Sequence, residues 1–409
     1  MDYRRDHPEV LSDFESAPLR RVRRWAWAAM GLWLLLLAAD WTARFRVFRW
    51  QDQWLPKRTP VVQDAGSREG FSANRVPAQT EGRLAQMVPV PWLAARYAEY
   101  HPERMEYRDP AGYCNEPLPA GKRYSVVMMG DSFMLSLGTQ NVAQVLASIG
   151  DISVYNHGMY GAGPFLEIRK FLSADRSDLN PQVVVWNLSA RELGAPLFSR
   201  QPVEAWFSQP KVGLPGQATA SSRVDWGAWA PSVLRDAWPN TSAAAYYSRI
   251  AWSQIKLLVF REWPGDVRGA DDPVFGPMLF YGENLRLLPY YTPEQDAPAV
   301  AQTVKRVAAG FRERGVSLVV LLVPEKEQIY IRAFPEEVRQ TLAQGPELLA
   351  AIADGLEEAG VPVVNLMPVF QEATARGEQL YWRDDTHWND AGIRLAAEEL
   401  WRVVGPLLK

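Results

Sequence analysis

The chain has 409 residues, 47% of them hydrophobic and 22% charged, so it can bury a core and form one large domain or two ordinary ones. Its net charge of −3 gives no reason to expect a nucleic-acid partner. The single cysteine, Cys114, excludes an intramolecular disulfide and a CxxC metal site. No metal and no cofactor site is predicted.

The first 43 residues have the pattern of a membrane anchor. Residues 1–24 are polar and end in a cluster of arginines, and residues 25–39 are uncharged. This uncharged run is shorter than the roughly 20 residues that span a bilayer, but extending it to residue 43 nearly closes the gap. We predict a cytoplasmic segment at 1–24 and a single-pass signal anchor at 25–43 in a bacterial inner membrane, with the rest of the chain in the periplasm. A cleaved signal peptide and a buried soluble helix are the alternatives.

The remainder of the chain alternates between apolar runs and helical patterns. Residues 44–85 lack periodicity and are predicted to be a linker, followed by a domain at 86–409. Strands are expected at 124–129, 152–155, 183–188, 317–323 and 361–366, and helices at 134–149, 164–173, 299–314, 347–359 and 389–403. This order predicts an α/β fold with a doubly wound, mostly parallel five-stranded sheet. Residues 193–296 are rich in Pro and Trp and too long for a connecting loop, so they indicate an aromatic-rich insertion.

One serine lies where a buried strand would deliver it to a ligand. The uncharged run Val126-Val127-Met128-Met129 ends in Gly130-Asp131-Ser132, and a helix-compatible segment follows. Ligands bind at the carboxyl ends of strands in such sheets, and a helix N-terminus favours developing negative charge. Ser132 is therefore a candidate nucleophile, which requires a base. Capping of the helix by Asp131 or Ser132 would also account for this tripeptide taken alone.

A candidate base precedes the last helix. His387 is one of only four histidines, and it follows Asp384 and Asp385. An acid two or three residues before a histidine can orient the ring and leave its Nε2 free as a base. Donors for an oxyanion would come from the glycine loop 156–161, which ends at Gly161 and is expected to follow the second strand.

These three segments together resemble the SGNH (GDSL-type) hydrolase superfamily. Gly130-Asp131-Ser132, the loop ending at Gly161 and the stretch 384–387 are similar to its first, second and fifth sequence blocks. The third block should supply an asparagine as an oxyanion donor, and that asparagine is missing here. The resemblance implies a doubly wound sheet and a Ser132–His387 pair, with Asp384 as the acid in the ordinary SGNH pattern.

Other motifs are similar to the alginate O-acetyltransferase branch of that superfamily. In place of the third block, Trp186 and Arg191 match a W-E-x-x-E-R stretch, although both of its glutamates differ. The stretches 385–388 (DTHW) and 324–330, which contains Lys326 and Tyr330, match two more motifs. The serine precedes DTHW here, whereas the order is reversed in the alginate proteins. This pattern favours Asp385 as the acid.

The resemblance also assigns roles to residues outside the triad. Arg191 would help to replace the missing asparagine donor, and Tyr330 would join the substrate-binding residues, whereas Lys326 would be structural. Structural alternatives are a surface ion pair for Arg191, ring packing for Tyr330 and a solvated side chain for Lys326. The implied function is a membrane-anchored extracytoplasmic O-acetyltransferase that acts on a polysaccharide through an acetyl-serine. The implied partner is a membrane-bound O-acyltransferase that supplies acetyl groups. A carbohydrate acetylesterase and an inactive glycan-binding scaffold of an export complex are the alternatives.

Overall fold

The computed structural model divides the chain into two compact units, residues 1–59 with 222–255 and residues 60–221 with 256–409. The structure describes residues 24–25, 27–36, 38–39, 62–63, 74–77, 84, 96–99, 101, 105–109, 113–115, 123–135, 139–173, 179–208, 251–252, 254–260, 262–263 and 266–408. Every site residue considered below belongs to the second unit.

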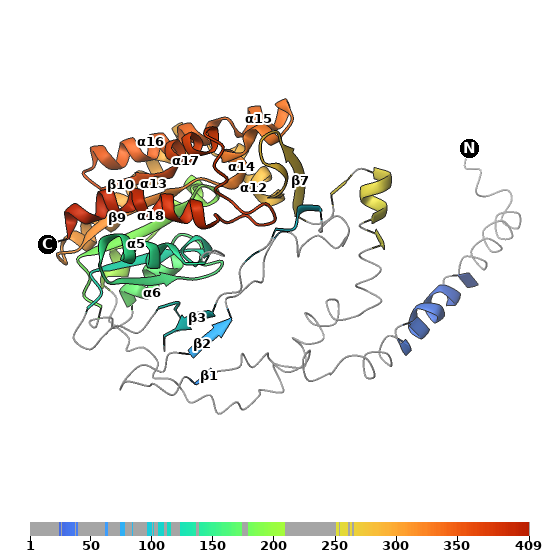
Figure 1. Ribbon diagram of the computed structural model, residues 1–409, viewed down its shortest axis with the longest axis horizontal. Coiled ribbons are helices and arrows are strands. Elements are labelled where there is room, and N and C mark those ends of the chain that lie inside the picture. The colour runs from blue at the N-terminus through green and yellow to red at the C-terminus, as the bar shows by residue number, and fades with distance from the viewer. Residues whose placement is uncertain are drawn as a thin grey trace, which may run out of the picture. The chain divides into compact units, whose positions relative to one another are not determined.

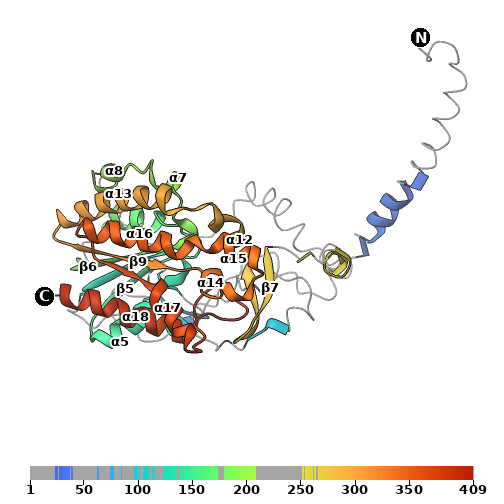
Figure 2. The same ribbon diagram turned by 90° about the horizontal axis from the view of Figure 1, so that it is seen from above.

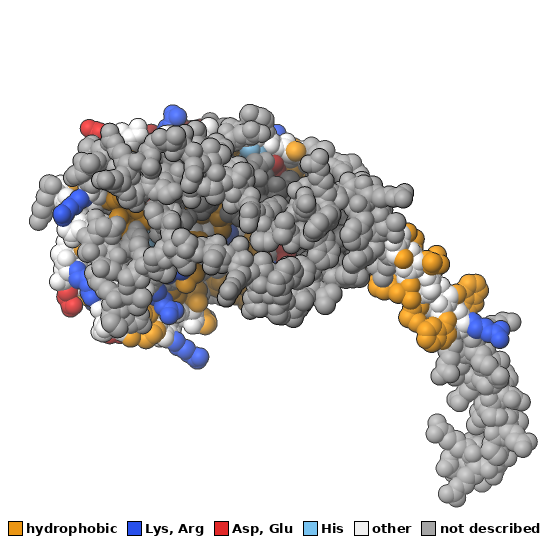
Figure 3. Space-filling view, turned by 90° about the horizontal axis from the view of Figure 1, so that it is seen from below, with side chains coloured by type: hydrophobic (Ala, Val, Ile, Leu, Met, Phe, Trp, Pro, Cys, Tyr) orange, Lys and Arg blue, Asp and Glu red, His pale blue; other side chains and the backbone are white. Residues whose placement is uncertain are grey.

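The first unit contains the predicted membrane anchor. Its described residues between 24 and 39 are helical, and their apolar side chains are exposed (Figure 3), including Trp25, Trp33 and Leu35. Among the residues that the structure describes, no helix has the length and apolar character needed to cross a membrane. The anchor at 25–43 thus stays a prediction.

The second unit is built on a five-stranded sheet. Its strands are β4 (Val126–Gly130), β5 (Val154–Gly158), β6 (Val183–Ser189), β9 (Ser317–Val323) and β10 (Val363–Asn365). They pair in the order β10-β9-β6-β4-β5, and every pairing is parallel. This confirms the predicted parallel sheet. The strand order reverses between β4 and β6, and ligands of such folds bind at that switch point.

Helices cover both faces of this sheet (Figures 1 and 2). On one face α5 (Val142–Gly150) contacts α18 (Asp390–Val404), and on the other α13 (Pro293–Arg312) contacts α16 (Gln344–Glu358). A third helix, α6 (Leu166–Ser173), packs beside α8 (Val203–Ser208), which contacts α13. Because both faces are covered, β4 and β6 are buried along their whole length, which explains their continuous apolar sequence.

Several predicted boundaries were wrong for local reasons. The helix expected at 134–149 begins only at Val142, because Asn141 and Gln144 form a reciprocal cap. The helix expected at 299–314 begins at Pro293, where Thr292 caps it, and it continues through Pro298. The strand expected at 152–155 extends to Gly158, so half of the predicted glycine loop is strand.

The predicted linker and insertion both contain structure that the sequence did not indicate. Within the linker, β1 (Val62–Gln63) and β2 (Asn74–Pro77) form an antiparallel sheet with β3 (Met105–Arg108). Within the insertion, residues 193–208 and 266–287 contribute buried side chains such as Trp206 and Phe280 to the core. The elements of these two stretches are α7 (Ala195–Phe198), α8, β7 (Val267–Asp272), β8 (Gly276–Tyr281) and α12 (Gly282–Leu287). Trp226, Trp229 and Trp238 lie outside the described residues.

Short helices complete the unit between and after the last strands. They are α14 (Lys326–Ile329), α15 (Glu336–Leu342) and α17 (Leu366–Ala375). The segment 376–389 joins α17 to α18 and carries the predicted catalytic histidine. We call residues 380–387 the histidine loop.

Candidate active site

Ser132 lies at the carboxyl end of β4, at the start of a short 3₁₀ helix (Ser132–Met134). The chain leaves the strand beside β6, and a Cβ atom at Gly130 would lie 2.6 Å from Cβ of Asn187, so only glycine fits. Asp131 caps the short helix, because its Oδ1 accepts a hydrogen bond of 3.0 Å from the backbone N–H of Phe133. The sequence pattern thus placed Ser132 at the predicted edge of the sheet.

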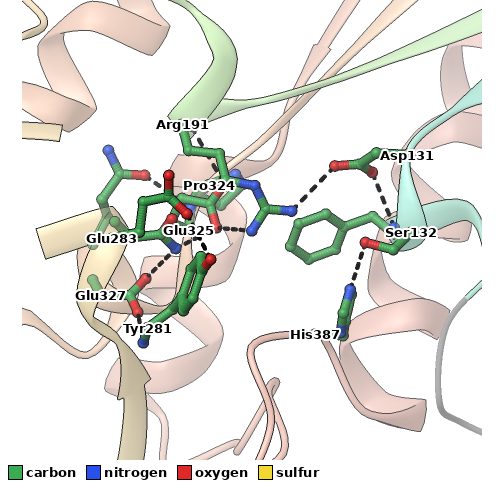
Figure 4. Close-up of polar contacts among 12 residues, drawn as sticks. Asp131, Ser132, Arg191, Tyr281, Glu283, Pro324, Glu325, Glu327 and His387 are labelled. Carbon is green, nitrogen blue, oxygen red and sulfur yellow. Dashed lines mark hydrogen bonds and ion pairs between the residues drawn. The ribbon is translucent and has the colours of Figure 1, made fainter. Parts of the chain in front are cut away.

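His387 faces Ser132 from the histidine loop (Figure 4). Its Nε2 lies 2.7 Å from Oγ of Ser132, and its Nδ1 lies 2.5 Å from Oδ1 of Asp385. The same carboxylate oxygen accepts the backbone N–H of His387 at 2.8 Å. Serine, histidine and acid therefore lie in one hydrogen-bonded line, which is the geometry of a nucleophile, a base and the group that orients the base.

The protonation of Asp385 suits this arrangement. Burial alone would raise the pKa of its carboxyl group, but the contacts with His387 outweigh burial and lower the pKa below its usual value. Asp385 is then a carboxylate that accepts the Nδ1–H of His387. Nε2 of His387 is left to accept the hydroxyl proton of Ser132.

Asp384, the other candidate acid, points elsewhere. Its Oδ1 lies 2.6 Å from Nε2 of His101, and its Oδ2 accepts a hydrogen bond from the backbone N–H of Glu99. The His101 ring stacks on Trp382, with 4.1 Å between the ring centroids. The structure brings Asp385 to His387 and gives Asp384 to a different histidine.

Arg191 contacts the residue before the serine. It follows β6, and its Nη2 lies 3.3 Å from Oδ2 of Asp131, while its Nη1 lies 3.4 Å from Oε2 of Glu325 (Figure 4). Burial opposes the positive charge, but Glu325 and Asp131 outweigh it and raise the pKa of Arg191 above its usual value. The guanidinium also lies over the ring of Phe133, 5.5 Å from its centroid. Its ion pairs are thus with Asp131, the residue before the candidate nucleophile, and with Glu325.

Buried carboxyl groups surround this arginine. Burial raises the pKa of Glu325 to about 7, although Arg191 opposes the change. Burial and the Asp131 charge raise the pKa of Glu192 to about 8. One cation therefore compensates only part of the cost of burying these acids. Among the described residues, no group of His, Cys, Asp or Glu is arranged to hold a metal ion.

Asn187 and Asn284 belong to the same network, and sequence reasoning missed both roles. Asn187 donates from Nδ2 to Oδ1 of Asp131 at 2.8 Å. Asn284 donates from Nδ2 to Glu325 at 3.0 Å and to Glu327 at 2.9 Å. The position of Asn187 directly after Trp186 on β6 was a usable signal, whereas Asn284 lies in the predicted insertion and has no sequence signal.

Gly161 and Tyr330 occupy different environments. Gly161 is exposed with φ +65°, in a loop that begins where the backbone N–H of Met159 donates to the carbonyl of Gly130. Tyr330 is fully buried, and its hydroxyl oxygen accepts from the backbone N–H groups of Leu380 and Tyr381. Its hydroxyl thus supports the backbone of the histidine loop inside the core, and a role of Tyr330 in substrate binding stays a prediction.

A comparison with known protein families finds one that matches this chain. Residues 54–190 and 279–407, more than half of the chain, match the family described as SGNH hydrolase-like domain, acetyltransferase AlgX. The chain belongs to this family. The matched stretches contain Ser132 and His387 and leave out residues 191–278.

The chain is also similar to curated proteins over part of its length. The chain is 27% identical over 162 residues to a probable alginate O-acetylase AlgJ from Azotobacter vinelandii. It is 29% identical over 154 residues to the protein of the same name from Pseudomonas putida. The matches cover 38% and 37% of this chain and the same shares of the relatives, so the chain matches little more than a third of their length.

Solved structures show only a slight likeness. A putative GDSL-like lipase from Parabacteroides merdae has 13% identity and a TM-score of 0.34, with 70% of this chain and 98% of that chain covered. An acetyl-xylooligosaccharide esterase variant from Geobacillus has 11% identity and a TM-score of 0.31, with 70% and 96% covered.

Proposed function

We propose that the protein is an SGNH-type O-acetyltransferase that acetylates a polysaccharide through an acetyl-Ser132 intermediate. The observation that carries the proposal is the line from Ser132 through His387 to Asp385, with distances of 2.7 and 2.5 Å, in a member of this family. The relatives named as alginate O-acetylases support transfer of acetyl groups to a glycan.

The reaction has two halves. His387 Nε2 takes the proton of Ser132, and the freed Oγ attacks the acetyl carbonyl of the donor. The tetrahedral oxyanion collapses, the leaving group receives the proton from His387, and acetyl-Ser132 remains. His387 then removes the proton of a sugar hydroxyl, whose oxygen attacks the acetyl carbonyl. The second tetrahedral oxyanion collapses, the bond between the acetyl carbon and Oγ breaks, and His387 returns the proton to Oγ of Ser132.

Backbone N–H groups at the sheet edge are the proposed oxyanion donors. The 3₁₀ helix beginning at Ser132 and the loop that contains Gly161 both leave the carboxyl ends of neighbouring strands. Arg191 is engaged by Asp131 and Glu325, so in this proposal it contributes positive charge near the nucleophile.

The cellular setting is part of the proposal. The exposed apolar side chains of residues 24–39 support a membrane anchor at 25–43, with the second unit in the periplasm of a bacterium. Because acetyl-CoA is cytoplasmic, we propose that a membrane-bound O-acyltransferase partner supplies the acetyl group.

The decisive test is replacement of the nucleophile. Ser132→Ala should abolish acetyl transfer from an activated acetyl ester to oligosaccharides, because no other group occupies the position 2.7 Å from His387 Nε2 among the described residues. Circular dichroism and the thermal midpoint serve as controls for folding. A folded variant with near-normal activity would remove Ser132 from the reaction.

The same assay separates transfer from hydrolysis. Acetate release and acetylated oligosaccharide are measured together, because water and a sugar hydroxyl compete for acetyl-Ser132. We expect slow acetate release without acceptor and faster donor consumption with the correct polymer. Rapid hydrolysis without any acetylated glycan would establish an acetylesterase in place of the transferase.

A further inference from the structure

Lys326 is a buried lysine at the centre of the backbone contacts beside the active site. It is the first residue of α14, three residues beyond the end of β9, and none of its surface is exposed. Its Nζ donates to four carbonyl oxygens, those of Leu279 at 2.7 Å, Trp382 at 2.6 Å, Arg383 at 3.0 Å and Asp385 at 3.0 Å.

Burying an ammonium group is costly unless its protons are used. Burial lowers the pKa of Lys326 to about 8, while the negative charges of Glu327, Asp385 and Asp384 act in the opposite direction. An ammonium has three N–H donors, so four acceptors use its full capacity with one proton shared. An apolar side chain of similar length would fill the space and leave these carbonyls without this donor.

The four carbonyls connect two segments that lie far apart in the sequence. Three belong to residues 382–385 of the histidine loop, immediately before His387. The fourth belongs to Leu279 on β8, whose backbone N–H also donates to the carbonyl of Arg383 at 2.8 Å. Nζ of Lys326 therefore joins β8 and the histidine loop beside the end of β9, together with the hydrogen bond from Leu279 to Arg383.

The contact at Asp385 leads directly to the reacting groups. Lys326 holds the carbonyl of Asp385, and the carboxylate of the same residue accepts both the backbone N–H and the Nδ1–H of His387. A displacement of the backbone at Asp385 would therefore move His387 relative to Ser132.

We propose that Lys326 is a positioning residue of the active site. By fixing the backbone of residues 382–385, it keeps Asp385 in contact with His387 and His387 in contact with Ser132. Lys326 touches none of the reacting atoms. This inference rests on the proposed function in one respect, because the effect of Lys326 on kcat is measured through the reaction at Ser132.

The test compares Lys326→Met with Lys305→Met, the same change at an exposed lysine of α13. The kcat and KM for a small activated acetyl ester are measured for both variants and for wild type. We expect kcat of Lys326→Met to fall about 100-fold, with little change in KM, because small displacements of catalytic groups have effects of this order. Lys305→Met should behave as wild type, and Lys326→Gln, which keeps two N–H donors, should recover part of the loss.

Amide hydrogen exchange supplies a readout that does not depend on activity. In Lys326→Met, exchange should accelerate in peptides covering 380–387 and stay slow in β4 and β6. A folded variant with wild-type kcat, or with wild-type exchange at 380–387, overturns the inference. Faster exchange in every core peptide alike also overturns it, since that result would indicate a role in global stability alone.

Two controls keep the outcomes distinct. If Lys326→Met does not fold, the same criteria apply to Lys326→Gln. If wild type is no more active than Ser132→Ala, the proposed function fails, and hydrogen exchange alone then decides whether Lys326 fixes the histidine loop.

Discussion

Asp384 and Asp385 are neighbours in the chain, and their carboxylates contact different histidines. Asp385 accepts from His387, whereas Asp384 pairs with His101 at 2.6 Å. Asp385→Asn should lower kcat by about 10⁴, because the amide would favour the wrong tautomer of the ring. Asp384→Asn should have a much smaller effect. Steady-state kinetics with the acetyl ester measure both, and a larger loss from Asp384→Asn would reverse the assignment.

Glu192 predicts a pH dependence of stability. Burial primarily raises the pKa of Glu192 to about 8 in the folded protein. Its contribution to the free energy of unfolding is therefore fully present below about pH 4.5 and is lost as the pH rises towards 8. The glutamine of Glu192→Gln cannot ionise. The stability of this variant should therefore be close to that of wild type at pH 5 and higher than that of wild type at pH 9. Allowing for partial solvent screening, we expect a gain on the order of 2 kcal/mol in the free energy of unfolding.

Urea denaturation at pH 5 and pH 9 measures this difference. Glu313→Gln, at an exposed glutamate after α13, is the matched control and should show no such change between the two pH values. Equal stability of wild type and Glu192→Gln at pH 9 would show that Glu192 ionises without cost.

Two helices on one face of the sheet, α18 and α5, each begin at an asparagine N-cap, and the two asparagines contact different segments. Asn389 caps α18 two residues after His387, with Oδ1 accepting from the backbone N–H groups of Ala391 and Gly392, and its Nδ2 donates to the carbonyl of Gln379. Asn141 caps α5 by a reciprocal bond with Gln144. The first cap is thus joined to the segment that carries the histidine.

Asn389→Ala and Asn141→Ala should each destabilise the protein by about 1 kcal/mol, the usual value of an N-cap. Only Asn389→Ala should also lower kcat, because it releases the backbone on both sides of His387. Thermal unfolding and ester kinetics on the two variants check this. Equal kcat for both would separate the α18 cap from the site.

We predict that the protein remains attached to a membrane through the anchor at residues 25–43. We expect the native protein to be extracted from bacterial membranes only by detergent and to keep residues 1–43, as measured by intact mass. The physical reason is the apolar helix between residues 24 and 39, whose exposed side chains include Trp27, Trp33 and Leu35. Recovery of a shorter protein that begins near residue 40 would indicate the cleaved signal peptide instead.

Patterns within single segments of the sequence were enough to predict the parallel sheet and the two segments that carry Ser132 and His387. The apolar runs that form β4, β6 and β9 predicted the parallel sheet, because a strand buried on both faces has no polar alternation. The tripeptide ending in Ser132 and the stretch ending in His387 were each recognised from a short motif, and the family resemblance implied that the two residues pair. These predictions depend on residues close together in the sequence.

Only the tertiary structure decided which groups pair with one another. The sequence pattern favoured Asp385 over Asp384, but only the structure shows that Asp384 pairs with His101, which lies more than 280 residues earlier in the chain. The contacts of Lys326 could be recognised only in the structure, because β8 and the histidine loop both place backbone carbonyls within hydrogen-bonding distance of its Nζ. Hydrogen bonds between distant segments leave no periodic trace in the sequence, since each partner is an ordinary polar residue or a backbone group that every residue carries.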